Sequence, residues 1–368
     1  MQKIKQFVKN YIPIFTIVSF FLAFIFWVIL EIAKASPIFA ELIGSYVGGP
    51  VRGFFGTLAS LIPFSLAEIM IILIPLVVTA LIIYGVKVID GRRCAVRLIL
   101  TVMSVLMLIY PIYVVTLGAG YHRVGIASRL EIVADNPDEN ELYSTMMKIS
   151  YELEELVPSI SYNNSGASVT KLTPQEISEE ICKSYERVAE KYPNLRLDIF
   201  NQRAKPVILS KGMTQLELLG IYTFFTGESN VNVHYPDYTL PFSIAHEFAH
   251  ARGISRENEA NFIAFLVCIN ADEPYIKYSG YMNMYEYLAS ALSKANKNML
   301  KNVYAMSSSR VTGEMRAYSE FYYANQNKLF GELSDFINDL YLKSQGTEGI
   351  ISYGLVVRLC VGYYEGTQ

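Results

Sequence analysis

Two histidines and a glutamate are the residues of this sequence whose types and spacing could do chemistry. His246 and His250 stand four positions apart, and Glu247 follows the first of them. On a helix, positions i and i+4 lie one turn apart on the same face, so both imidazoles can bind one ion. Glu247 would project beside that ion, where its carboxylate can take a proton from a bound water. The spacing predicts a zinc (Zn2+) site in which Glu247 is the catalytic base.

A helix with two histidines facing solvent is the competing interpretation of this segment. The chain has only four histidines, and two of them form this pattern. Ile244, Phe248 and Ala251 occupy the other sides of the helix, which indicates that the segment is buried. Burying two imidazoles and a carboxylate costs free energy unless a metal or hydrogen-bonding partners satisfy them. The metal interpretation is therefore favoured.

A catalytic zinc ion with one open position needs a third protein ligand. Gly253 can end the first helix in the left-handed conformation and Ser255 can cap the next one, which predicts a tight helical hairpin. In this hairpin Glu257 would stand opposite the histidines, whereas Glu259 would point about half a turn away. We predict Glu257 as the third ligand, with Glu259 as the alternative. Asn261 lies on the same face as Glu257 and could orient a ligand by a hydrogen bond.

The residues before this helix predict a strand, Ser229–Tyr235, that could bind substrate. Asn230 and Asn232 alternate there with Val231 and Val233. An extended peptide could pair with the edge of this strand. In the alternative interpretation the strand is internal and its asparagines only close turns. Three side chains are candidates for a hydrogen-bond donor to the transition state, although a lone histidine is more often a surface residue: His234, Tyr278 and Tyr281.

The composition of the chain indicates a membrane protein. Of its 368 residues 52% are hydrophobic, which exceeds the norm for soluble domains, and a net charge of -3 gives no basic face for nucleic acid. Residues 11–33, 66–89 and 96–117 are apolar segments long enough to cross a bilayer as helices. The first is too long for a signal peptide and lacks a clear cleavage site. Between the first two segments, Ser36–Ser65 is expected to be interfacial or partly re-entrant.

Basic residues indicate how the three spans are oriented. They precede the first span and gather between the second and the third: Lys3, Lys5, Lys9, Lys87, Arg92, Arg93 and Arg97. The positive-inside rule places them in the cytoplasm, which leaves residues 118–368 outside it. Arg123 and Arg129 follow the third span and weaken this asymmetry.

The part of the chain after the spans is mostly helical with a small β element. Glu139–Leu156 carries apolar residues at helical spacing, and Thr173 to Glu176 is a helix start with a capping box. Val207–Ser210 is a second strand candidate. The other expectations are a turn-rich loop at Ser161–Ser168, helix breaks at Gly253, Pro274, Gly280 and Gly331, and a buried helix at Ile350–Tyr364.

The four cysteines form no C-x-x-C pair: Cys94, Cys182, Cys268 and Cys360. Each lies in or beside an apolar stretch and is expected to act as a small buried hydrophobe. A disulfide between two of the last three is the alternative.

The segment HEFAH, followed by E-N-E-A-N-F, resembles the zincin pattern in which HExxH precedes E-x-x-A-[DN]. In that pattern the first Glu is the third zinc ligand, which corresponds to Glu257. Together with Ile62–Ser65 and Phe225–Asn232, these motifs look like those of the DUF3810 family, bacterial membrane proteins regarded as zinc metallopeptidases. The resemblance covers nearly the whole chain. It implies a zincin-like fold, a bound Zn2+ and proteolysis.

These observations predict a mainly α protein with a three-helix transmembrane region, residues 1–117, and an extracytoplasmic zincin-like metallopeptidase domain, residues 118–368. We expect hydrolysis of peptide bonds by zinc-activated water, with the lipid bilayer and a peptide or protein near the membrane surface as partners. The alternative is a non-catalytic sensor or scaffold whose helices are held together by zinc. An intramembrane protease is disfavoured because the histidines lie far downstream of the spans.

Overall fold

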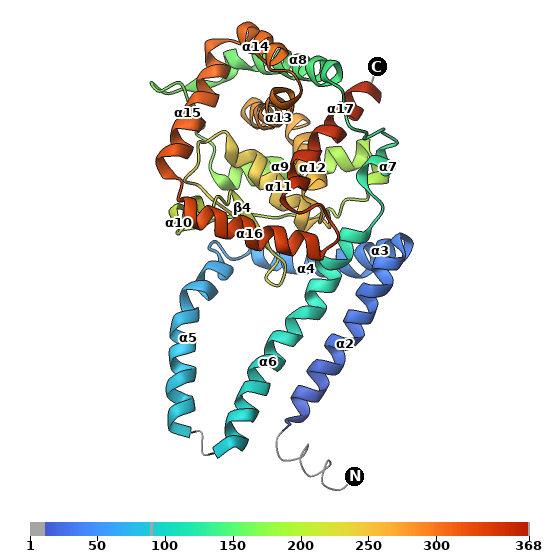
Figure 1. The fold of residues 1–368 in the computed structure, drawn as a ribbon, viewed down its shortest axis with the longest axis vertical. Helices are drawn as coiled ribbons and strands as arrows, with labels where there is room; N and C mark the ends of the chain where they lie inside the picture. Colours follow the sequence, from blue (N-terminus) through green and yellow to red (C-terminus); the bar gives the residue numbers. More distant parts are fainter. Residues whose placement is uncertain (1–11, 89–90, 367–368) are drawn as a thin grey trace.

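Three long apolar helices extend from one side of a larger helical body in the computed structural model (Figure 1). The structure describes residues 12–88 and 91–366. The long helices are α2 (Ile14–Ala35), α5 (Leu66–Val88) and α6 (Gly91–Thr116). Each is long and apolar enough to cross a membrane, which confirms the three predicted membrane helices. The predicted ends at Tyr11 and Ile89, and the three N-terminal lysines, lie outside the described residues.

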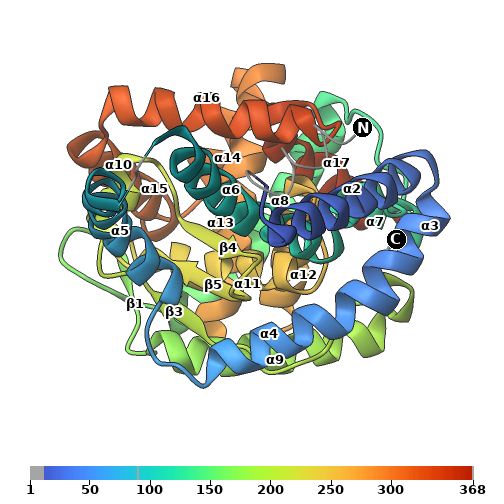
Figure 2. The same ribbon diagram turned by 90° about the horizontal axis from the view of Figure 1, so that it is seen from below.

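The segment predicted to be interfacial or re-entrant forms the junction between the long helices and the body. It contains α3 (Pro37–Leu42), a π-helical stretch η1 (Ile43–Gly48) and α4 (Gly49–Ser60). Seen from below, α3 and α4 run along the edge of the body (Figure 2). Arg52 of α4 pairs with Asp198 at 2.6 Å, and the buried Lys205 donates to the carbonyl of Ala59 at 2.7 Å. Polar contacts therefore fasten the junction to the body.

The body consists of helices around one hydrophobic core. Its central helices are α8 (Glu139–Leu156), α9 (Pro174–Lys191), α11 (Thr239–Ala251), α12 (Glu257–Ile269) and α13 (Pro274–Ala295). Its outer helices are α14 (Lys297–Met306), α15 (Ser309–Asn325), α16 (Lys328–Ser344) and α17 (Val356–Gly366). Its short helices are η2 (Gly118–His122), α7 (Ile126–Leu130), η3 (Val157–Ser159), η4 (Pro193–Leu195), α10 (Ser210–Gln215) and η5 (Gly349–Leu355). The predicted mainly α fold is confirmed.

Helices α8 and α9 begin where local sequence signals place them. Asp138 and Glu141 form a capping box at the start of α8, and Thr173 and Glu176 form the predicted one at α9. Behind the first box, α8 packs its apolar face on α13, with Ile149 fully buried. Burying a side chain of this size stabilises the fold by about 1.5–3 kcal/mol.

Two predicted helix breaks are wrong. Gly280 lies inside α13 and Gly331 lies inside α16. A Cβ at Gly280 would stand 2.5 Å from Cβ of Cys268 on α12, and one at Gly331 would stand 2.7 Å from a carboxylate oxygen of Glu217. Both glycines therefore allow close approach of a neighbour instead of ending a helix. The predicted helix at residues 350–364 is 3-10 helical up to Leu355 and becomes α-helical at α17.

A three-stranded sheet packs on α11. Its strands are β3 (Ala204–Pro206), β4 (Gly220–Thr223) and β5 (Glu228–Val231). Their order is β3-β5-β4, with β3 parallel and β4 antiparallel to β5. The prediction of a strand at Val207–Ser210 is wrong, because β3 has ended at Pro206 and Ser210 begins α10. The predicted strand Ser229–Tyr235 is shorter than expected, because the chain leaves the sheet after Val231.

The turn-rich loop predicted at Ser161–Ser168 is the tip of a small hairpin between β1 (Ser161–Tyr162) and β2 (Ser168–Val169). The side-chain carbonyl of Asn163 accepts the amide protons of Ser165 and Ala167 and closes the turn. The loop prediction holds for the tip, and the strands on either side are two residues each.

All four cysteines lie among the described residues and are free. Cys182, Cys268 and Cys360 are buried, as expected for small hydrophobes, whereas Cys94 is exposed. The described structure therefore has no disulfide between the three downstream cysteines.

Candidate metal centre

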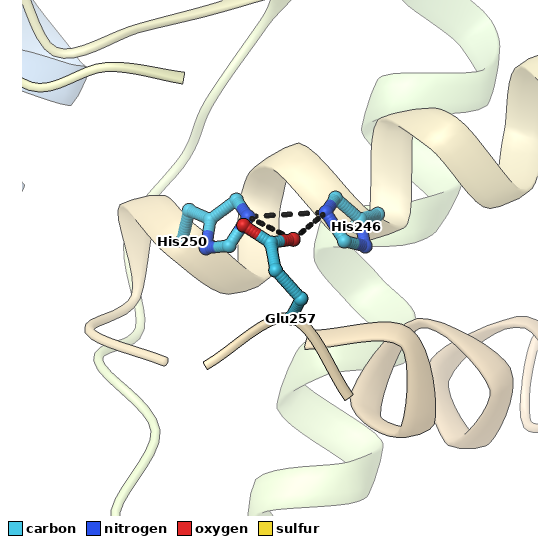
Figure 3. A group of neighbouring side chains, drawn as sticks. All are labelled: His246, His250 and Glu257. Carbon is cyan, nitrogen blue, oxygen red and sulfur yellow. Dashed lines mark hydrogen bonds and ion pairs between the residues drawn. The ribbon is translucent and has the colours of Figure 1, made fainter. Parts of the chain in front are cut away.

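The two histidines of the HExxH segment point in the same direction from α11 (Figure 3). Their Nε2 atoms are 3.0 Å apart. Glu257, the first residue of α12, faces them with Oε2 3.2 Å from Nε2 of His246 and 3.5 Å from Nε2 of His250. The structure therefore brings together the three residues predicted as metal ligands.

Glu259, the alternative third ligand, points elsewhere. Its Oε1 accepts the backbone N–H of Ile126 and pairs with Arg256 at 3.0 Å. The carboxylate therefore joins α12 to the chain that follows the third long helix, and it takes no part in the three-residue group.

The turn between α11 and α12 sets the position of Glu257 relative to the two histidines. Gly253 has φ of +87°, so it ends α11 in the predicted left-handed conformation. Ser255 does not cap α12 as expected, because its hydroxyl donates to the carbonyl of Leu117 at 2.7 Å. Arg123 donates to the carbonyl of Gly253 at 3.1 Å and pairs with Glu41 at 2.9 Å. The ligand-bearing turn is thus held by the end of α6 and by the junction helices.

Hydrogen bonds on the far side of each ring fix which nitrogen faces the group. Nδ1 of His250 lies 2.8 Å from the carbonyl of Ile254, which can only accept, so this nitrogen carries the proton. Nδ1 of His246 lies 2.8 Å from Oδ1 of Asn261, whose amide nitrogen donates to Tyr287. The Nε2 atom of each ring therefore faces the other ring and the Glu257 carboxylate. Three such atoms this close can share a proton or bind a cation between them.

The spacing and charge of the group suit a zinc ion. A tetrahedral ion with ligand bonds of about 2.0–2.1 Å needs donor atoms about 3.3 Å apart. The observed separations are 3.0, 3.2 and 3.5 Å. Burial alone would lower the pKa of His250, but the Glu257 carboxylate raises it to about 9. Burial likewise opposes ionisation of Glu257, yet the two imidazoles hold its pKa well below the usual range. The site attracts positive charge.

Glu247 is buried beside this group and touches the sheet. A Cβ at Gly220 of β4 would stand only 2.4 Å from its Oε1. Its Oε2 has no hydrogen-bond partner among the described residues. Burial raises the pKa of Glu247, while the charges of His246 and His250 oppose the shift. Glu247 thus follows His246 on α11 with one carboxylate oxygen that has no hydrogen-bond partner in the described structure.

A cavity of about 880 Å3 opens beside the three ligands. Its walls come from six parts of the chain: β4 with the residues on either side of it, the ligand helices α11 and α12, the central helix α13, the outer helix α16, the end of α6 with η2, and η5. His246, Glu247, His250 and Glu257 all line it. Among the described residues no fourth His, Cys, Asp or Glu joins the three ligands, and their group lies on the cavity wall.

The predicted strand residues support the sheet and lie outside the cavity lining. The side-chain amide of Asn230 donates to Thr223, and that of Asn232 donates to the carbonyl of Leu218. Strand β5 is internal, between β3 and β4. The alternative interpretation, an internal strand whose asparagines only close turns, therefore applies. Strand β4 is the one beside the cavity.

The three predicted donor candidates also lie outside the cavity lining. Nδ1 of His234 is 3.1 Å from the hydroxyl of Thr214. Tyr278 donates to the buried Glu314, and Tyr281 packs its ring on Phe265. These residues belong to the core and to the sheet, not to the candidate site.

Six tyrosines line the cavity, and none of them was predicted. Tyr113, Tyr121 and Tyr222 come from α6, η2 and β4, and three more come from α13, α16 and η5: Tyr287, Tyr341 and Tyr353. Tyr353 accepts a hydrogen bond from Asn338, and burial followed by the charge of Glu257 raises its pKa well above the usual value. With 27 tyrosines in the chain, no local pattern distinguishes these six. Tyr341 and Tyr353 reach the site because η5 packs on both α12 and α16.

Fold and site together define a mainly helical protein with three candidate membrane spans and a buried group of three metal-ligand side chains. The family model described as a protein of unknown function (DUF3810) matches residues 47–361. The chain belongs to this family, as its motifs predicted. Comparison with curated proteins and with solved structures gave no match.

Proposed function

We propose that this protein is a membrane-anchored zinc metallopeptidase. The observation that carries the proposal is the convergence of three ligand atoms, all within 4.8 Å of one another, on the wall of a cavity that also contains the Glu247 carboxylate. A bound zinc ion would lower the pKa of a water toward neutrality and polarise a peptide carbonyl. His246, His250 and Glu257 would hold it.

In this proposal Glu247 moves the proton. Its Oε2, which has no described partner, would accept the proton of the attacking water and later deliver it to the leaving amine. Contact with Gly220 keeps the carboxylate from turning toward the sheet. Asn261 and the carbonyl of Ile254 hold the two imidazoles in the tautomer that binds a metal.

Strand β4 would bind the substrate. It pairs with β5 on one side only, so among the described strands it is an edge. Its residues Gly220, Ile221 and Tyr222 line the cavity beside Glu247. An extended peptide could add to this edge by backbone hydrogen bonds, which would lay its scissile bond across the metal group. Substrate pairing is thus proposed for β4 and no longer for the internal strand β5.

The alternative function is a zinc-stabilised sensor or scaffold. Structural zinc sites have four protein ligands and no open side, whereas the described group has three and lies on a cavity. Removing the metal separates the two functions. A protein that stays folded and stops cleaving supports catalysis, and global unfolding supports the structural role.

The test of the proposal is Glu247→Gln in the full-length protein in lipid nanodiscs. Zinc content is measured by mass spectrometry, and cleavage is measured with a peptide library. We expect about one zinc per chain in both proteins, cleavage by the parent, and its loss in the variant. The exposed Glu155 supplies a matched control, Glu155→Gln, which should cleave normally. Undiminished cleavage by Glu247→Gln, or a parent that binds no zinc, would overturn the proposal.

We further propose that the body lies outside the cytoplasm, as the basic residues around the spans predict. Treatment of intact and permeabilised cells with a membrane-impermeant amine reagent tests this. Labelling of body lysines such as the exposed Lys183 in intact cells is the expected result. Labelling only after permeabilisation would place the body inside.

A further inference from the structure

Helix α16 lies across the base of the body, on the side from which the long helices descend (Figure 1). In the view from below it borders this face opposite α4 (Figure 2). Its residue Tyr341 stacks edge-on against Tyr121, which follows α6, at a ring distance of 6.1 Å. Tyr121 belongs to the third candidate span. Helix α16 therefore contacts the end of the third candidate membrane span.

An apolar stripe runs along the free side of α16. Its members recur at the spacing of one helical face: Leu329, Phe330, Leu333, Phe336, Ile337 and Leu340. Each is between 43% and 71% exposed. Six large apolar side chains on one helix exceed the scattered exposure that is normal on a soluble surface.

The remaining residues of α16 form two further sides, one buried against the body and one charged. Gly331 and Leu342 are buried and mark the side that packs on the body. At 100° per residue, the charged side chains fall on a separate edge: Lys328, Glu332, Asp335, Asp339 and Lys343. The apolar stripe lies between these two sides. A helix with one apolar and one charged free side is typical of elements that lie in a membrane interface.

The neighbouring loop places this face at membrane level independently. Ile208 is 85% exposed and Leu209 is 49% exposed. Their backbone N–H groups donate to the carboxylate of Glu68 at 3.0 and 2.7 Å. Glu68 is in the first turn of the second candidate span. Exposed apolar side chains therefore surround the points where the spans join the body.

We propose that α16 lies in the plane of the membrane interface, with its apolar stripe in contact with lipid acyl chains. The occupant of the stripe is the bilayer because α16 lies on the side of the body from which the candidate spans descend and contacts the end of the third span through Tyr341, so that those spans hold the helix near the lipid. Its charged edge holds three acidic residues and two lysines, so the contact is apolar and does not require anionic lipid.

The contact would also place the cavity at the lipid surface. Leu333 and Ile337 of the stripe line the cavity and are exposed, as are Ile221 of β4 and Ile350 of η5. These four side chains form the rim of the cavity. A ligand that enters the cavity and reaches His246, His250 and Glu257 therefore passes beside the membrane. This holds for any reaction at these residues.

Fluorescence quenching by brominated lipids tests the contact in the full chain. The single tryptophan, Trp27, is first replaced by phenylalanine, and Phe336→Trp or Leu340→Trp is then added. The control is Tyr151→Trp, at an exposed position on α8 at the opposite end of the body (Figure 1). In vesicles of phosphatidylcholine brominated near the top of the acyl chains, we expect about twofold quenching at 336 and 340, and none at 151.

Two results would overturn the proposal. One is emission from residues 336 and 340 that is as insensitive to bromine as that from residue 151. The other is quenching that appears only with anionic lipid. Cysteine cross-linking at residue 336 serves as a parallel measurement. A cross-linked dimer together with unquenched tryptophan would show that a second copy, and not lipid, covers the stripe.

Discussion

The contact between Gly220 and Glu247 gives a sharp test of the proposed chemistry. Gly220 has no positive φ, so alanine can adopt its backbone conformation without strain. Its added Cβ would lie 2.4 Å from Oε1, 2.7 Å from Cγ and 2.8 Å from Cδ of Glu247. Gly220→Ala therefore acts on the carboxylate without touching a metal ligand.

The size of the effect follows from these distances. Ordinary contacts of a Cβ begin at 3.4 Å, so Oε1 must retreat by 3.4 − 2.4, about 1 Å. A displacement of about 1 Å at a reacting group costs on the order of 100-fold in rate. This corresponds to about 2.7 kcal/mol in the activation free energy. The free energy of unfolding is a separate quantity. There, the lower backbone freedom of alanine in the unfolded chain offsets about 0.4–1 kcal/mol of the steric destabilisation.

The assay compares kcat, zinc content and thermal unfolding of the variant and the parent in nanodiscs. We expect a fall in kcat of about 100-fold, with zinc content unchanged and the fold intact. Gly212→Ala is the matched control, because a Cβ at Gly212 has nothing within 4 Å. Combining Gly220→Ala with Glu247→Gln should cost no more than Glu247→Gln alone, because both changes act on one group.

Two results would refute this reasoning. A Gly220→Ala protein as active as the parent would show that Glu247 is not held against β4. A variant that loses zinc in proportion to activity would show that the substitution disturbs the ligands and not the base.

Three further predictions concern the ligands and the junction. Glu257→Gln should abolish tight zinc binding while Glu259→Gln retains it, as measured by competition with a chelating dye; equal loss in both would contradict the ligand assignment. Asn261→Ala should weaken zinc binding by about 10–100-fold, because it removes the acceptor that orients an imidazole; unchanged affinity would contradict this role. Burial alone would raise the pKa of Glu41, but Arg123 outweighs it and the pKa falls to about 2. Ionised Glu41 should therefore stabilise the parent over Glu41→Gln by up to about 3 kcal/mol above pH 4.5, and denaturant unfolding should show this difference disappearing as the pH falls toward 2. A difference that does not change with pH would show that the ion pair contributes nothing.

Several features of the protein were predictable because they depend on neighbours in the sequence. The helix that carries His246 and His250 places them together through its own pitch, whatever surrounds it. The capping box at Thr173 and the left-handed end at Gly253 are likewise local. The three candidate spans are visible as long apolar segments, because the thickness of the bilayer sets the length of a helix that crosses it.

Other features depend on which distant segments meet. Ser255 was predicted to cap a helix, but its hydroxyl donates a hydrogen bond to the carbonyl of Leu117, directly after α6. Gly280 looked like a break, yet it serves close packing of α13 on α12. The partner of Ser255 lies 138 residues away in the sequence, and that of Gly280 lies on the preceding helix, so neither contact is visible in the residues next to it.

The sequence by itself determined the two imidazoles, the carboxylate between them, the three apolar spans and the membership of the family. Only the tertiary structure decided that Glu257 and not Glu259 faces the imidazoles, that β4 is the strand at the cavity, and that α16 leaves its apolar stripe exposed. The physical reason is the range of the interactions. Helix pitch and capping act over a few residues, whereas the choice among carboxylates, strands and helix faces is made by packing between separate elements, some of them distant in the sequence, as in the contact of Arg123 with Gly253.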